Sequence, residues 1–189
     1  MTKAAVASLV LLVATPGDAG QLAGVTLPDR VSVAGHELVL NGLGLREATP
    51  FIVDVYVAGL YVEAKTSDPA AILSPHAVKQ LAMKFVRSVG KENLTNVFTE
   101  GFEKNVGDKR AAVAEGLAVL NAAMTDVKQD DVITLTYEPG AGVAVSVRGH
   151  ETAMIPGEDF QQVLFSIWLG ANPRDVSMRD GLLGRSPND

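Results

Sequence analysis

The feature that most constrains the fold is a run of strand-forming residues from Phe51 to Val62, FIVDVYVAGLYV, directly after Pro50. The run has no helical period and is rich in Val, Ile and Tyr, which favour β-strands. Pro50 supports a start at this point, because the residue before a proline is pushed out of the helical region. The run therefore predicts a long central strand of a sheet.

Alternating residues on both sides of this run predict further strands. Residues 31–42 (VSVAGHELVLNG) hold two short alternating runs separated by Ala34-Gly35, a pattern typical of a hairpin, and the stretch from Val78 alternates again. Residues 131–139 and 142–150 flank Gly140-Ala141, which indicates a second hairpin, and residues 151–157 continue toward an edge strand.

Helical periods separate and follow these strands. One apolar stripe is expected in residues 91–107, and an alanine-rich helix in residues 109–124. A third helix is expected in residues 156–170, ending at Gly170, and a last one from an Asn172-Pro173 start to Leu183. The order of elements predicts an α+β fold, a large and mostly antiparallel sheet with a layer of helices on one face.

The N-terminus has the order of a secretory signal peptide. Lys3 precedes an apolar stretch, Ala4 to Ala14, and small residues allow cleavage after Ala19. A buried or anchoring N-terminal helix is the alternative, but this stretch is shorter than the roughly 20 residues that span a bilayer. We therefore expect a signal peptide at 1–19, a domain at 20–184 and a disordered tail at 185–189. The mature protein would be periplasmic or secreted, without stable membrane insertion.

Charge and composition exclude several classes of function. The net charge is −6 and no basic run is longer than Lys109-Arg110, so no nucleic-acid partner is expected. The chain lacks cysteine, which excludes a thiol nucleophile, and its histidines, His36, His76 and His150, fall in separate turns or strand ends. No nucleophile-elbow or dinucleotide-binding glycine motif occurs. We expect no metal and no cofactor.

Five polar residues near the long strand remain as candidates: Arg46, Asp54, Tyr56, Lys84 and Arg87. Asp54 and Tyr56 share one strand face, and a buried carboxylate needs a partner. The three cations are candidate partners of Asp54, and a cross-strand ion pair is the structural interpretation. Arg46 follows the glycines of GLGLR, which would let the backbone approach a guest, and it suits bidentate capture of a carboxylate or phenolate.

Four stretches in the same order resemble the chalcone isomerase fold family, in particular its bacterial chalcone isomerase-like members. They are GLGLR, VYVAGLYVEAK, MKFVRSVGKENLTNVFTEGFEKN and IPGEDFQQVLFSIWLG. The resemblance implies a large antiparallel sheet under a layer of helices, with a cleft between them. It also implies one of two functions: closing a chalcone to a flavanone, or non-enzymatic binding of a fatty acid.

The resemblance places Arg46 on the key arginine of the family. Tyr56 takes the place of the enzymes' strand threonine, Phe102 that of their helix tyrosine and Asn105 that of their lysine. The threonine or serine in the enzymes' C-terminal helix falls near Gln161. The tyrosine hydroxyl and the lysine that order water and polarise the ketone are thus replaced.

We therefore predict an exported, non-enzymatic protein that binds a small apolar anion such as a fatty acid. The expected ligand-binding residues are the five at family positions: Arg46, Tyr56, Phe102, Asn105 and Gln161. A chalcone isomerase-type intramolecular lyase acting on a chalcone or related enone is the alternative. A structural module of the cell envelope, with its cleft filled by side chains, is a third possibility.

Overall fold

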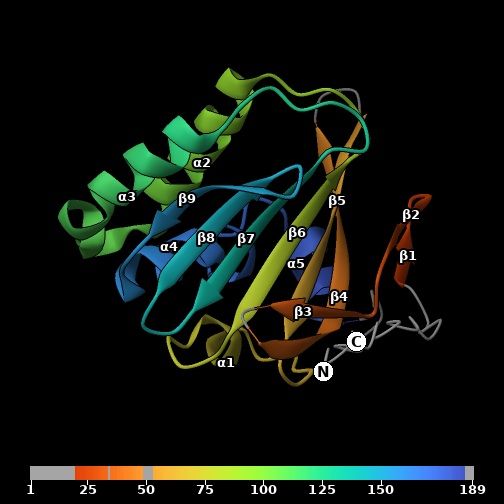
Figure 1. The fold of residues 1–189 in the computed structure, drawn as a ribbon, viewed down its shortest axis with the longest axis horizontal. Helices are drawn as coiled ribbons and strands as arrows, with labels where there is room; N and C mark the ends of the chain where they lie inside the picture. The colour runs from red at the N-terminus through yellow and green to blue at the C-terminus, as the bar shows by residue number, and fades with distance from the viewer. Residues whose placement is uncertain (1–19, 34, 49–52, 186–189) are drawn as a thin grey trace, which may run out of the picture.

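A seven-stranded antiparallel sheet dominates the computed structural model, which describes residues 20–33, 35–48 and 53–185 (Figure 1). Its strands follow one another in space as they do in sequence, so each pairs with its neighbour in the chain. They are β3 (Arg30–Val33), β4 (His36–Ala48), β5 (Val53–Val62), β6 (Lys79–Phe85), β7 (Val132–Glu138), β8 (Gly142–Val147) and β9 (His150–Ile155). A separate hairpin, β1 (Gly20–Leu22) and β2 (Val25–Leu27), lies beside β4.

Within the described residues, five helices complete the fold: α1 (Pro69–Leu73), α2 (Lys91–Asn105), α3 (Arg110–Ala123), α4 (Glu158–Leu169) and α5 (Val176–Leu182). The short 3-10 turn η1 (Gly107–Lys109) joins α2 to α3. α4 is the hub of the layer, because it contacts the four other helices. One hydrophobic core joins this layer to one face of β5 through β9. The predicted α+β fold, a large antiparallel sheet with a helical layer, is confirmed.

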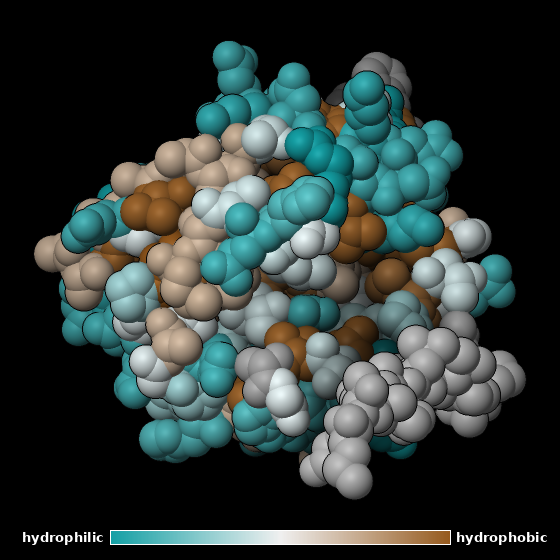
Figure 2. Space-filling model, in the orientation of Figure 1, coloured by the Kyte–Doolittle hydropathy of each residue, from teal (hydrophilic) through white to brown (hydrophobic). Residues whose placement is uncertain are grey.

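The long run of the sequence is an interior strand with both faces covered. Tyr56 and Leu60 of β5 belong to the core beneath the helices, whereas Val57 packs with the β1–β2 hairpin and Tyr61 with side chains of β4. Double burial explains why the run is apolar at nearly every position instead of alternating. Toward β9 the outer face of the sheet is more polar, and Figure 2 shows hydrophilic residues interspersed with hydrophobic ones there.

The GLGLR stretch is part of a strand. β4 continues through it to Ala48, so Arg46 lies inside a strand and opposite Tyr56. The two glycines admit α5, because a Cβ on Gly42 would lie 2.1 Å from the carbonyl oxygen of Gly181, and one on Gly44 would lie 2.7 Å from Met178. The guest that these glycines accommodate is therefore a helix of the same chain.

The last helix begins later than predicted. Asp175, and not Asn172, caps α5, because its Oδ1 accepts a hydrogen bond of 3.0 Å from the backbone N–H of Met178. The start of the tail is also attached to the fold, since the Arg185 guanidinium donates to the carbonyl of Ser67 at 2.8 Å. The expected signal peptide and residues 186–189 lie outside the described residues. In the described part of the chain, no helix is long and apolar enough to cross a membrane.

Candidate functional site

A cavity of about 510 Å³ opens where the ends of β4, β5 and β6 meet the first turns of α2. This volume is typical of small-molecule sites. Apolar side chains from the sheet and from α2 form much of its wall, and three arginines and one glutamate supply its charges. The lining residues are Arg46, Ala48, Val55, Tyr56, Phe85, Arg87, Ser88, Val89, Asn93, Leu94, Asn96, Val97, Glu100 and Arg174.

Arg46 reaches this cavity from the C-terminal end of β4, and 19% of its side chain is exposed. Its guanidinium lies 3.6 Å from the Asp175 carboxylate and also donates to the backbone carbonyl of Glu47. Asp175 thus has two tasks, because one oxygen caps α5 and the other pairs with Arg46. The helix that packs on the glycines of β4 consequently also carries the counter-ion of the arginine.

Tyr56 lies directly across from Arg46 on β5 and is buried. Its hydroxyl oxygen accepts a hydrogen bond of 3.1 Å from the indole N–H of Trp168 in α4. Burial raises the pKa of this phenol above its ordinary value, although the Trp168 bond and the nearby arginines act in the opposite direction. Tyr56 therefore keeps its proton at neutral pH. Among the hydrogen bonds of the described residues, the hydroxyl accepts this one and donates none.

The other charges are arranged around the entrance. Arg174, in the loop between α4 and α5, donates to the Glu100 carboxylate of α2 at 2.8 Å and so links this loop to α2. This bond lowers the pKa of the Glu100 carboxyl. Arg87 is exposed and forms no ion pair within the described ranges. Three cations against one carboxylate give the lining a positive balance, opposite to that of the whole chain.

The expected pairing of Asp54 was wrong. Its neighbour across the strands is Glu47, and no ion pair between described residues includes it. Of its candidate partners, Arg46 pairs with Asp175 and Lys84 with Asp130. A bulge between Arg46 and Glu47 shifts the register at this point, which sequence periodicity does not reveal. Because Asp54 is only half-buried, water can solvate its carboxylate.

The structure brings only two of the five expected ligand residues, Arg46 and Tyr56, to this cavity. Phe102 is buried in the core, with its ring 5.4 Å from that of Phe160. Asn105 bonds to the carbonyls of Gly101 and Asn172 at the end of α2.

Gln161 is fully buried beneath α1 and donates to the carbonyl of Leu73 at 3.1 Å. It lines a different, shallower hollow between α1 and the start of α4. The aromatic side chains of the core fill the space between sheet and helices, so the described interior holds no long cleft that would join these residues to Arg46.

Sequence reasoning missed three residues of the site: Trp168, Arg174 and Asp175. Trp168 fell in the third expected helix and the other two at the start of the last one, and none of the three was assigned a role. The signal that could have found Asp175 is its spacing to Met178, which suits an N-cap. Nothing in the sequence indicated that this cap would face Arg46.

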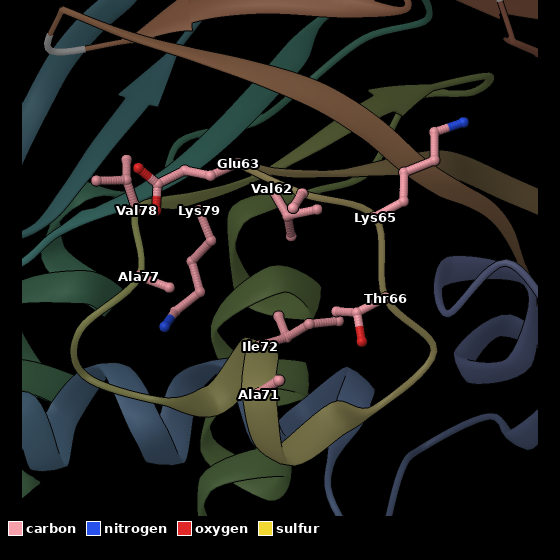
Figure 3. A pocket seen from close by; sticks show the side chains of 10 residues that line it. Val62, Glu63, Lys65, Thr66, Ala71, Ile72, Ala77, Val78 and Lys79 are labelled. Atoms are coloured by element: carbon pink, nitrogen blue, oxygen red, sulfur yellow. The ribbon is translucent and has the colours of Figure 1, made fainter.

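A second cavity, of about 310 Å³, lies at the opposite end of β5 (Figure 3). The segment from β5 through α1 to β6 encloses it, and Val62 and Ile72 form its apolar wall. Lys79 is fully buried beside it, and its Nζ donates to the carbonyl of Ser74 at 2.7 Å. Burial lowers the pKa of this amine to about 7.

Metal binding has no support in the described residues, where no group of three His, Asp or Glu side chains is close enough to hold an ion. The features that do stand out are an α+β sandwich and an apolar cavity with cations at one end of the sheet.

This fold places the chain among known proteins. Residues 19–184 match the model of the chalcone isomerase-like family, so the chain belongs to that family. The solved structures include a similar one, the fatty-acid binding protein AtFAP1 of Arabidopsis thaliana, with a TM-score of 0.70 and 16% sequence identity over 85% of this chain and 92% of that one. At this identity the likeness concerns the fold. No curated protein matches the sequence.

Proposed function

We propose that this protein binds a small apolar anion, in particular a fatty-acid-like carboxylate, in the cavity at Arg46. The observation that carries the proposal is the pairing of donors and apolar wall in one cavity. Arg46 and Tyr56 lie side by side at its inner end, and Val55, Phe85 and Leu94 line it. A carboxylate would accept hydrogen bonds from the two donors, while its alkyl chain would contact the apolar wall.

The replaced positions favour binding over catalysis. Phe102 and Asn105 stand where the resemblance expects the enzymes' tyrosine and lysine, and both lie away from the cavity. A lyase acting on an enone remains the alternative, because Arg46 and Tyr56 would also stabilise an enolate oxygen. The fatty-acid binding activity in the name of the Arabidopsis neighbour agrees with the first of these functions.

The test is calorimetric titration of the purified protein with decanoate. Arg46→Ala should weaken binding on the order of tenfold or more, because it removes a charge-assisted hydrogen bond. Arg110→Ala is the matched control, since Arg110 is an exposed cation of α3 outside the cavity. Equal binding by both variants, or none by the wild type, would contradict the proposal. Accelerated cyclisation of a 2′-hydroxychalcone would support the lyase instead.

We further propose that the protein is exported and acts in the periplasm or outside the cell. The support is the order of charge, apolar stretch and small residues before Ala19. Expression of the full chain in a bacterium, followed by fractionation and intact-mass measurement, tests this. A periplasmic product beginning at Gly20 is expected, and a cytoplasmic product that retains residues 1–19 would contradict it.

A further inference from the structure

Arg46, Arg174 and Tyr56 are side chains of this cavity that can donate hydrogen bonds. Arg46 forms an ion pair with Asp175 and donates to the backbone carbonyl of Glu47, and Arg174 donates to the Glu100 carboxylate. Tyr56 differs, because its hydroxyl both donates and accepts. Which of the two it offers to a ligand depends on what the protein itself supplies to it.

The protein supplies a donor from a rigid position. Trp168 lies in the last turn of α4, is buried and packs edge-on against Phe98 at a centroid distance of 6.3 Å. Its Nε1–H can only donate, so the 3.1 Å contact with Tyr56 fixes the phenol oxygen as the acceptor. The hydroxyl proton must then point away from the indole, and Tyr56 lines the cavity, which Trp168 does not.

We propose that Trp168 is a specificity-determining residue of this cavity: its indole N–H makes Tyr56 a donor, and the site thereby selects ligands whose polar head accepts hydrogen bonds. With Arg46 and Arg174, Tyr56 completes a set of three donors. A carboxylate satisfies these donors, whereas the proton of an alcohol or amine finds no acceptor among the three, and the lining carboxylate Glu100 is already paired with Arg174. The inference rests on the proposed function and gives the reason for its preference for anions.

The burial of Tyr56 supports this assignment. Because burial raises the pKa of its phenol, the group stays neutral and keeps the proton that it would donate. The charged groups that act on the phenol are Arg46, Arg174 and Asp175. The two arginines favour its ionised form and the carboxylate opposes it, and burial outweighs them.

Trp168 is the only tryptophan of the chain, which permits a clean test. Replacing tryptophan biosynthetically with β-(3-benzothienyl)alanine exchanges the indole N–H for sulfur at this one position and nearly keeps the ring shape. Titration with decanoate and with decan-1-ol then gives a ratio of two affinities. A purely structural role would lower both affinities alike and leave their ratio unchanged.

We expect the wild type to prefer decanoate, and the sulfur analogue to reduce the preference on the order of tenfold, because Tyr56 becomes free to accept from the alcohol. In a Tyr56→Phe background the same exchange should leave the ratio unaltered. Trp168→Phe serves as a second variant.

The outcomes separate the two proposals. A wild type that binds decanoate through Arg46 but shows the same ratio with either residue at 168 would overturn the role of Trp168 alone. A wild type that binds no decanoate would overturn both.

Discussion

Cationic side chains line both cavities, at opposite ends of β5, and their partners in the protein differ. At one end Arg46 and Arg174 pair with carboxylates near the surface, Asp175 and Glu100. At the other end Lys79 is buried, and no ion pair of the described residues includes it. The two arginines can release their carboxylate partners and bind a ligand, whereas Lys79 has a structural role.

The contacts of Lys79 support a structural role. Its Nζ lies 4.6 Å from the centre of the Tyr137 ring and 5.6 Å from that of Phe165, and it donates to the carbonyl of Ser74. The neighbouring carbonyls, of Leu73 and Pro75, accept from Gln161 and Tyr137. Three consecutive carbonyls at the end of α1 therefore accept hydrogen bonds from side chains of α4, β6 and β7. A cation beside a cavity therefore marks a ligand site only while its donors remain available.

The largest effect is expected at the Arg46 end, where α5 packs on β4. Gly42→Ala would place a methyl group 2.1 Å from the carbonyl oxygen of Gly181, so backbone must move. We expect a loss of about 3 kcal/mol in the free energy of unfolding, measured by urea denaturation. Gly90→Ala is the control, because its nearest neighbour lies 3.8 Å away, and should cost less than about 1 kcal/mol. Equal stability of the two variants would contradict close packing of α5.

The next effect concerns pH at the Lys79 end. The folded-state pKa of Lys79 is lowered to about 7, so between pH 7 and its ordinary value near 10.5 the unfolded chain binds more protons. The contribution of Lys79 to stability therefore rises with pH across this window and is flat below it. Relative to Lys79→Met, the wild type should gain about 2 kcal/mol between pH 6.5 and 9.5.

Lys84→Met provides the control for that comparison. Lys84 pairs with an exposed carboxylate, Asp130, in a partly exposed position, so this substitution should leave the pH dependence of wild-type unfolding intact. A parallel pH profile of the wild type and Lys79→Met would mean that the buried amine titrates as it does in water.

A smaller effect, on ligand affinity, is expected when the carboxylate beside Arg46 is removed. Asp175→Asn keeps an oxygen that can cap α5 but removes the negative charge beside Arg46. Decanoate affinity should rise a few-fold, since the ligand no longer competes with a carboxylate, and the pair is partly exposed. Asp180→Asn, whose carboxylate pairs with Arg179 and Arg185, should leave the affinity unchanged. A fall in affinity in Asp175→Asn alone would show that Asp175 orients Arg46 more than it neutralises it.

The smallest effect is expected at Gln161. Its Oε1 is buried with no hydrogen-bond partner among the described residues, while its Nε2 donates to Leu73. Gln161→Met loses the donor but also removes the unsatisfied oxygen, so stability should change by about 1 kcal/mol or less. Decanoate binding should not change, because Gln161 does not line the Arg46 cavity. Weakened binding in this variant would return Gln161 to the ligand site.

Much of the fold could be predicted from periodicity. The alternation in β7 and β8 and the helical stripes of α2 and α4 each record which face is buried, and these elements, like β3 and β9, lie where expected. The pattern failed in β4, where glycines interrupt the alternation. Their reason is the close approach of α5, a contact distant in sequence that no local pattern records.

The candidate site was only partly predictable for the same kind of reason. The resemblance drew attention to Arg46 and Tyr56, and the strand register brings them together. Phe102 and Gln161 were placed in a cleft that the packed core does not leave open. Whether such a space stays open depends on how all the core side chains pack together, which no local pattern records.

Residue types and their periods are enough to give the α+β class, the interior position of β5 and an arginine beside it, because burial and backbone preference are local properties of the sequence. The groups that surround this arginine depend on tertiary packing. Asp175, Trp168 and Arg174 come from segments more than a hundred residues further along the chain, and their contacts with Arg46 and Tyr56 follow from how α4 and α5 pack on the sheet.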